Sequence, residues 1–259
     1  MPEGDVLLRV ARRLTAALAD LPLVRVELRW PGVSDAELTG HTSLGTACYG
    51  KHLLTRLDNG HTLHTHLRME GRWRIRHTTT PPERLGRPLV RAVLATQRWT
   101  CVGEELGMMD VLRTRDEPIL LGHLGPNLMA EEPDVSRAAA NLRTQGGRSI
   151  GAVLLDQRVA AGIGTIYLAE TLWRHRISPW RPSNEVENPE SVFATAAALM
   201  RRSADAPTLT ATGLREQPTF VHDRAGLACP RCGGLIAVAS VGEPPFDRPA
   251  YHCPACQAA

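Results

Sequence analysis

The stretch SIGAVLLDQRVAAGIGTIYLAETLWRHR, residues 149–176, decides the fold of the second half of this 259-residue chain. It contains two apolar patterns of helical spacing, separated only by AGIGT at 161–165. Gly162 and Gly164 allow the backbone to reverse within this short connection. The sequence therefore predicts a pair of helices joined by a tight glycine turn.

The same glycine turn is a candidate anion site. Gly162 and Gly164 permit close backbone approach, and the following helix offers unpaired N–H groups and the positive end of its dipole. We expect Thr165 to be the N-cap of this helix and a DNA phosphate to be the bound anion. A purely structural reversal is the alternative.

The residues before this stretch predict a β-rich half. Residues 6–19 form an amphipathic helical pattern with Asp5 as the expected N-cap, and residues 23–115 contain short runs separated by turn signals, typical of antiparallel strands. We therefore expect an α+β multidomain protein. Its predicted segments are an N-terminal domain at 1–118, a linker at 119–133, a helical domain at 134–223 and a cysteine-containing C-terminal segment at 224–259.

The C-terminal segment carries a metal-binding pattern. Its four cysteines are two pairs of Cys-x2-Cys separated by twenty residues, namely Cys229, Cys232, Cys253 and Cys256. This spacing favours one tetrahedral zinc ion, and four thiolate ligands leave no open position, so the zinc is structural. A redox dithiol is a poorer interpretation for both pairs together. Cys48 and Cys101 lie in apolar surroundings and are expected to be small core residues.

Positive charge is distributed unusually. The formal net charge is +3, and Lys51 is the single lysine among 30 basic residues, which leaves 30 − 1 = 29 arginines. An ammonium group can transfer a proton and a guanidinium cannot, so Lys51 is a candidate acid-base residue, with chance survival of a surface lysine as the alternative. Arg248, in the loop between the two cysteine pairs, is a candidate phosphate ligand or a solvated loop arginine.

The N-terminus offers a nucleophile. A penultimate proline permits removal of Met1, which would expose the secondary amine of Pro2, and an α-amino group has a pKa of about 8. Such an amine can attack an aldehydic sugar carbon to give an iminium, which drives elimination of the phosphate, while Glu3 shuttles protons. The alternative is that Pro2 only begins the chain and Glu3 favours the first helix electrostatically.

Other function classes find less support. The chain has no apolar run long enough to cross a bilayer, and the acidic Glu3 and Asp5 argue against a secretory signal, so we expect a cytoplasmic protein. A metal-dependent nuclease would need a carboxylate-rich cluster, which the sequence lacks. A second metal site at His61, His64 and His66 is conceivable, but solvated or phosphate-facing strand histidines are preferred.

Read together, six motifs resemble the formamidopyrimidine-DNA glycosylase and endonuclease VIII family, more closely on its endonuclease VIII side. They span the chain in family order: PEGD (2–5), YGKHLL (49–54), HLRMEG (66–71), GIGTIY (162–167), VHDRAGLACPRCG (221–233) and YHCPACQ (251–257). The resemblance implies an N-terminal antiparallel β-sandwich with a leading catalytic helix, then a helix-two-turn-helix domain closed by a four-cysteine zinc finger. It also implies a bifunctional DNA glycosylase and AP lyase that cuts the abasic strand by imine formation and β/δ-elimination.

The resemblance assigns roles by position. Pro2 resembles the Schiff-base nucleophile, Glu3 the general acid and Lys51 the lysine that assists base release. Arg248 resembles the zinc-finger phosphate ligand, and Gly164 with the residue after it resembles the phosphate-binding turn.

The motif HLRMEG resembles the family segment that fills the space left by a flipped nucleotide. Here these residues are Arg68 and Met69, with Glu70 as a further candidate, and His66 is expected near the DNA. Met69 would be the apolar wedge. An ordinary core position for Met69 is the alternative.

One departure from the family concerns the glycine turn, where Thr165 stands in place of the family asparagine. Threonine lacks one of the hydrogen-bonding groups of the asparagine amide, and we expect this loss to weaken the contact with DNA.

The expected substrates are oxidised pyrimidines and abasic sites in damaged DNA, acted on by a monomer. The rival function is a non-catalytic zinc-finger protein of the same fold that binds damaged DNA.

Overall fold

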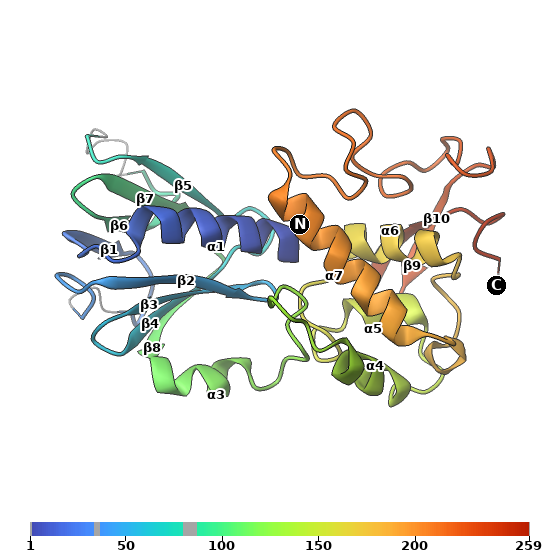
Figure 1. The fold of residues 1–259 in the computed structure, drawn as a ribbon, viewed down its shortest axis with the longest axis horizontal. Coiled ribbons are helices and arrows are strands. Elements are labelled where there is room, and N and C mark those ends of the chain that lie inside the picture. Colours follow the sequence, from blue (N-terminus) through green and yellow to red (C-terminus); the bar gives the residue numbers. More distant parts are fainter. Residues whose placement is uncertain (1, 34–36, 80–86, 259) are drawn as a thin grey trace. The chain divides into compact units, whose positions relative to one another are not determined.

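The computed structural model describes residues 2–33, 37–79 and 87–258. Contacts divide the chain into two compact units: Pro2 with residues 6–123, and residues 3–5 with the chain from Leu124 onward. Helix α1 (Gly4–Leu18) therefore begins in the second unit and continues in the first. Figure 1 shows the elements of both units, which are described separately below.

The first unit is a sandwich of two four-stranded antiparallel sheets, as the resemblance implied. One sheet has the strand order β1-β6-β7-β5 and the other β2-β3-β4-β8. Their bounds are β1 Arg25–Leu28, β2 Ser43–Tyr49, β3 His52–Leu57, β4 His61–His66, β5 Arg72–His77, β6 Val90–Ala95, β7 Trp99–Glu104 and β8 Met108–Arg113.

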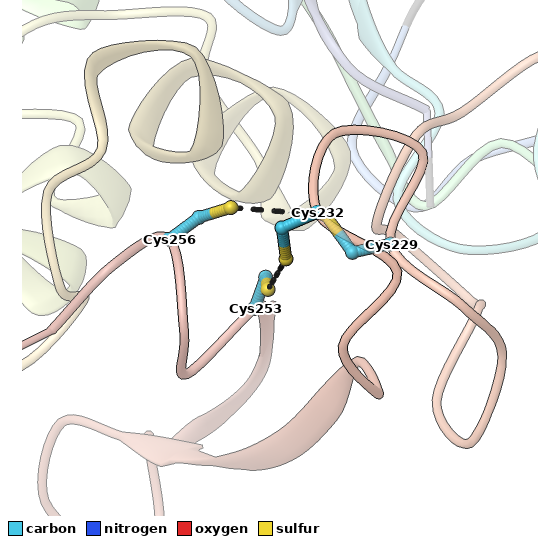
Figure 2. Close-up of side chains that lie close together, drawn as sticks. All are labelled: Cys229, Cys232, Cys253 and Cys256. Atoms are coloured by element: carbon cyan, nitrogen blue, oxygen red, sulfur yellow. Dashed lines mark hydrogen bonds between the residues drawn. The ribbon is translucent and has the colours of Figure 1, made fainter.

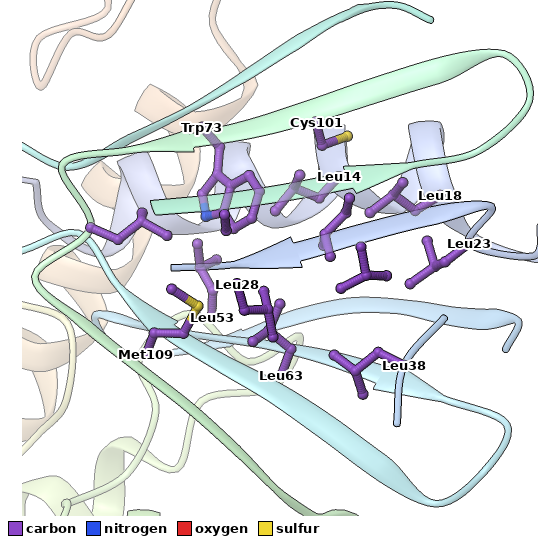
Figure 3. Packing of buried hydrophobic residues seen from close by; sticks show 14 of the residues in the cluster. Leu14, Leu18, Leu23, Leu28, Leu38, Leu53, Leu63, Trp73, Cys101 and Met109 are labelled. Atoms are coloured by element: carbon purple, nitrogen blue, oxygen red, sulfur yellow. The ribbon is translucent and has the colours of Figure 1, made fainter. Parts of the chain in front are cut away.

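The core of this unit follows from the sequence pattern. Leu7, Leu14 and Leu18 recur at helical spacing on α1 and are all buried, which confirms the expected amphipathic helix. They pack with inward side chains of the strands in one cluster (Figure 3). Cys101 is fully buried in this cluster and Cys48 packs against it, so both are small core residues as expected.

Burial also makes these two thiols unreactive. It raises the pKa of Cys48 to about 11 and that of Cys101 to about 12, so the nucleophilic thiolate is scarce.

A short helical segment closes the first unit. It comprises a 3-10 turn η1 (Thr114–Asp116) and α3 (Glu117–Leu121), so the segment expected to be a linker, 119–133, begins inside a helix. Pro118 fits the first turn because a helix leaves its first N–H groups unbonded. Glu117 anchors the segment through a bidentate ion pair with Arg56, with contacts of 2.8 and 2.6 Å.

The second unit is helical and carries a small hairpin. Asp134 and Asn188 cap two of its helices by accepting N–H groups three residues ahead, at 2.9 and 3.0 Å. The elements are α4 Val135–Arg143, α5 Ile150–Leu155, α6 Thr165–His175, the 3-10 turn η2 Ser183–Glu185, α7 Pro189–Asp205, β9 Ala237–Val241 and β10 Arg248–His252. Helices α5 and α6 are the pair predicted around the glycine turn. Within the described ranges, no helix is both long and apolar enough to span a bilayer.

Candidate functional site

The carboxylate of Glu3 lies at the N-terminus of α6. Its Oε2 accepts N–H groups from Gly164 at 2.7 Å and Tyr167 at 3.3 Å, and its Oε1 accepts the N–H of Ile166 at 2.8 Å. The side chain is only 1% exposed. The unbonded N–H groups and dipole of the helix stabilise the negative charge of a carboxylate in this position.

This geometry corrects one expectation for the glycine turn. Gly164, not Thr165, is the N-cap, and Thr165 is the first helical residue. The N–H groups of Gly164 and Ile166 donate to the carboxylate of Glu3 within the same unit. The sequence correctly suggested an anion at this helix terminus, but it could not show that the chain itself supplies one.

Gly164 is required by the close approach of Glu3. A Cβ atom built on Gly164 would lie 2.4 Å from Cδ of Glu3 and 2.7 Å from its Oε1. Gly162 has a φ of +126°, a conformation that suits glycine, and its carbonyl accepts the N–H of Gly4 at 2.9 Å. The two glycines therefore bring the backbone of the turn against residues 3–4.

Asp5 forms a second buried attachment. Its Oδ2 accepts hydrogen bonds from the hydroxyl of Tyr167 at 2.6 Å and that of Ser203 at 2.8 Å. The expected N-cap role of Asp5 is wrong, because α1 begins at Gly4 and Asp5 lies in its first turn. Burial, reinforced by the Asp5 carboxylate, raises the pKa of Tyr167, so the phenol remains a donor.

The other two residues of the expected catalytic set lie in the first unit. Pro2 is partly buried and directly precedes Glu3, while Met1 lies outside the described residues. Lys51 lies in the turn between β2 and β3 and is also partly buried. Its charge contributes to a lowered pKa of His66, a value of about 4 that results mainly from burial.

The segment 67–71 forms a tight turn between β4 and β5. Met69 is 61% exposed, which excludes the core alternative. The N–H of Gly71 donates to the carbonyl of Leu67 at 2.9 Å, and the N–H of Arg68 donates to Nδ1 of His66 at 2.9 Å. The turn is thus held by its own hydrogen bonds while the methionine side chain is presented to solvent.

Glu170 is a buried residue that the sequence reasoning did not single out. It is 0% exposed, and its carboxylate accepts the N–H groups of Phe220, Val221 and His222 at 2.8–3.1 Å. Burial raises its pKa although these three donors oppose the shift. Glu170 lies three residues after Tyr167, on the buried side of an apolar helix. An acidic residue at such a position is unusual, and this pattern could have indicated a buried carboxylate with specific partners.

The four predicted zinc ligands are brought together (Figure 2). Their sulfur atoms all lie within 4.8 Å of one another, with 3.9 Å between Cys229 and Cys256 and 3.5 Å between Cys232 and Cys253. Tetrahedral zinc with Zn–S bonds of about 2.3 Å requires S–S separations of about 3.8 Å, so the cysteines fit this ion. Among the described residues no other group of three or more potential ligands clusters in this way.

Hydrogen bonds prepare one of these sulfurs for a cation. The indole N–H of Trp173 donates to Sγ of Cys229 at 3.4 Å, and although burial acts to raise the pKa of this thiol, backbone donors hold it at about 6. Burial and the neighbouring sulfurs raise the pKa of Cys256 to about 12. Without a metal, the four thiols therefore do not all ionise easily together. A divalent cation bound among them stabilises all four thiolates.

Arg248 is the first residue of β10, and it is exposed. It pairs with Val241 in the β9–β10 hairpin, and its Nη1 donates to the carbonyl of Asp247 at 2.7 Å. Arg248 thus lies in a strand of this hairpin and not in a loop between the cysteine pairs.

The expectation that the strand histidines are solvated is wrong for His64, which is 0% exposed. His61 pairs with Glu37 at 3.3 Å, whereas His64 contacts His52 and Asp110. His66 packs edge-on against His52. The three histidines therefore do not converge on one metal site among the described residues.

Two family models match the chain. The formamidopyrimidine-DNA glycosylase N-terminal domain matches residues 1–115, and the H2TH domain of the same family matches residues 124–212. The chain is 42% identical over its full length to a probable endonuclease 8 2 of Streptomyces coelicolor, of which 94% is covered. It is 35% identical to the DNA-(apurinic or apyrimidinic site) lyase Nei2 of Mycolicibacterium smegmatis, with both chains fully covered.

Solved structures show the same fold. The Lactococcus lactis Fpg (MutM) in complex with an oxidized pyrimidine containing DNA aligns over the whole of both chains with a TM-score of 0.84 and 24% identity. MutM in complex with carbocyclic 8-oxo-G containing DNA aligns as completely, at the same TM-score and 23% identity. With two family models, full-length relatives and this fold in agreement, the chain belongs to the formamidopyrimidine-DNA glycosylase family.

Proposed function

We propose that the protein is a bifunctional DNA glycosylase and AP lyase of base excision repair, with Pro2 as its nucleophile. The observation that carries this proposal is the buried Glu3 carboxylate, fixed by three backbone N–H groups of the α6 terminus beside Pro2 in the chain. Family membership and the lyase name printed for a full-length relative support the same activity.

The chemistry begins at the sugar of the damaged nucleotide. The Pro2 nitrogen, freed by removal of Met1, attacks C1′ as the bond from C1′ to the base breaks, and the base leaves with a proton. On an existing abasic site the same nitrogen condenses with the C1′ aldehyde and water leaves. Displacement of the base leaves the sugar ring closed, so the C1′–O4′ bond then breaks and O4′ takes up a proton. Both routes thus give an iminium, which acidifies C2′ because its positive nitrogen accepts the electron pair.

Loss of a C2′ proton then breaks the C3′–O3′ bond and releases the 3′ phosphate, and a second elimination breaks the C5′–O5′ bond. Water hydrolyses the remaining imine and regenerates Pro2. Glu3 supplies and removes protons during these steps, and Lys51 assists departure of the base. Fixed backbone donors hold the Glu3 carboxylate in place throughout these steps.

DNA contacts come from both units. Met69 is the apolar wedge that replaces the flipped nucleotide, with Arg68 and His66 beside it. Arg248 on the hairpin binds a backbone phosphate. The turn at Gly164 and Thr165 also faces DNA in this proposal, although several of its N–H groups already serve Glu3.

The preferred substrates are oxidised pyrimidines and abasic sites. The motif VHDRAGLAC and the endonuclease 8 names of the relatives support this side of the family. One structural zinc ion, bound by the four cysteines, would hold the hairpin that carries Arg248. We propose a monomer acting in the cytoplasm, where reducing conditions keep the thiols available to the metal.

Borohydride trapping on an oligonucleotide with one abasic site tests the nucleophile. Methionine-free protein, verified by mass spectrometry, should give a covalent protein–DNA adduct. A form with one residue kept before Pro2 has an amide nitrogen at that position and should bind the DNA without forming the adduct. Binding without any adduct from the methionine-free form would instead support the non-catalytic damage-binding function.

An experiment with a chelator distinguishes the imine mechanism from that of a metal-dependent nuclease. Strand cleavage should persist at a modest chelator concentration that leaves the structural zinc in place, measured by zinc content of the recovered protein. Immediate loss of cleavage with zinc still bound would contradict the imine mechanism.

A further inference from the structure

The outer face of the sheet β2-β3-β4-β8 carries a group of polar residues that includes His52, His64, His66 and Asp110. In the register, His52 pairs with His66, and His64 pairs with both Leu54 and Asp110, so their side chains project from the same face. The alternating residues of these strands, among them Leu53, Leu63 and Met109, face the core. The sandwich core therefore does not explain why a histidine is completely buried at position 64.

Three of these residues form one hydrogen-bond chain. Nδ1 of His64 lies 3.0 Å from Oδ2 of Asp110, and Nε2 of His64 lies 2.9 Å from Nδ1 of His52. A carboxylate can only accept, so His64 donates from Nδ1. A neutral His64 must then accept at Nε2, which requires His52 to donate from Nδ1. The chain thus has a single consistent assignment of protons, beginning at the half-exposed Asp110 side chain.

This chain ends at the two turns that carry proposed active-site residues. His52 follows Lys51 directly and closes the β2–β3 hairpin by pairing with Tyr49. Its ring also packs edge-on against His66, with 5.0 Å between the ring centroids. His66 in turn accepts the N–H of Arg68 and so belongs to the Met69 turn.

The electrostatic surroundings keep the imidazoles neutral. Burial lowers the pKa of His52 to about 3, assisted by His66, His64 and His123, and it also lowers the pKa of His64 despite the Asp110 carboxylate. A proton on His64 would turn its Nε2 into a donor facing the donor of His52, so neutrality preserves the chain.

We propose that His64 is a positioning residue for base release, because the Asp110–His64–His52 chain holds the Lys51 turn in its working geometry. The inference rests on the proposed glycosylase function and adds residues outside its catalytic set. It predicts a loss in the rate of base release and not in DNA affinity, since no member of the chain needs to contact the substrate.

Two near-matched substitutions test the role of His64. His64→Gln retains an acceptor for His52 near the place of Nε2, whereas His64→Asn retains a donor for Asp110 near Nδ1 and loses the bond to His52. Single-turnover excision of an oxidised pyrimidine should slow by about tenfold in His64→Asn, while His64→Gln should stay within about threefold of the wild type. The dissociation constant for a duplex with an uncleavable abasic analogue should change by less than about twofold in either variant.

An equal loss of excision rate in both variants, or a loss of affinity that matches the loss of rate, would overturn the positioning role. If His64→Asn does not fold, the comparison moves to the exposed end of the chain. There Asp110→Leu removes the acceptor that fixes the Nδ1–H tautomer of His64, which a glutamine at position 64 does not need, and it should slow excision. Asp110→Asn retains an accepting oxygen and should excise at about the wild-type rate, and unchanged excision in Asp110→Leu overturns the inference.

Wild-type trapping keeps this test separate from the proposed function. If the wild type gives no borohydride adduct on an abasic site, the proposed function fails. If the wild type traps normally and His64→Asn excises bases at the wild-type rate, only the positioning role fails.

Discussion

Two pairs of ionisable groups, one in each unit, are stabilised in opposite ways. In the first unit, His52 and His64 are kept neutral and are bonded to other side chains. In the second, the carboxylates of Glu3 and Glu170 are surrounded by backbone N–H groups. Side-chain partners can titrate and backbone donors cannot. We therefore expect the histidine network to respond to pH, and the two carboxylates to respond to substitutions that push them away from their backbone donors.

The sharpest test of the second arrangement is Gly164→Ala. The added Cβ would lie 2.4 Å from Cδ of Glu3, and the carboxylate must leave its three donors to make room. We expect the free energy of unfolding to fall by about 3 kcal/mol, from overpacking and the lost buried hydrogen bonds. Abasic-site cleavage should fall by at least about a hundredfold because Glu3 is displaced. Chemical denaturation and single-turnover cleavage measure the two effects.

Gly147→Ala is the matched control. A Cβ on Gly147 meets nothing within 4 Å, so stability and cleavage should both be unchanged. Wild-type behaviour of Gly164→Ala would contradict the argument that Glu3 depends on this close approach.

The first unit should respond to acid. The pKa of His52 is lowered from 6.5 to about 3, so between these values the unfolded chain binds a proton that the folded chain excludes. Stability from His52 is therefore complete above about pH 6.5 and declines as the pH falls towards about 3. At about pH 4 the loss amounts to about 2 kcal/mol after allowance for the partial exposure of the ring.

Denaturation at several pH values, compared with His52→Gln, isolates this contribution. The variant cannot titrate at position 52, so its stability should decline less steeply with acid than that of the wild type. Parallel pH profiles would show that the His52 network does not control acid sensitivity.

The sequence predicted elements with regular patterns best. The period of Leu7, Leu14 and Leu18 indicated α1, and the spacing of the two Cys-x2-Cys pairs indicated a cluster that the fold assembles. Both patterns are local or repeat a known ligand spacing, so neither requires knowledge of distant partners.

The sequence could not provide partners that are distant along the chain. Glu3 and Gly164 are 161 positions apart, and Asp5 and Ser203 are 198 apart, yet these contacts decide the roles of the two acidic residues. Local rules assigned the N-cap to Thr165 because its hydroxyl is a suitable capping group. They could not anticipate that a carboxylate from the N-terminus would take the helix N–H groups instead.

Glu170→Gln tests whether backbone donors require a charged acceptor in the second unit. The amide keeps one oxygen but places an NH2 group against the N–H groups of Phe220, Val221 and His222. We expect a loss of about 1.5 kcal/mol in the free energy of unfolding. Hydrogen exchange at the three amides should also accelerate, whereas Glu190→Gln, at a partly exposed position on α7, should leave it unchanged. Retained protection in Glu170→Gln would show that the segment is held by other contacts.

The smallest expected effect on stability is that of Met69→Ala. This variant tests whether an exposed side chain can matter for base excision without contributing to the stability of the fold, in contrast to the buried networks. Met69 is 61% exposed, so its removal should change the free energy of unfolding by less than about 0.5 kcal/mol. Base excision should nevertheless slow by about tenfold, because the wedge offsets part of the cost of unstacking the damaged base. Leu44→Ala, at 60% exposure on β2, should leave both quantities unchanged. A marked loss of stability with normal excision would instead show that Met69 contributes to packing of the fold and not to DNA distortion, since a wedge acts only when DNA is bound.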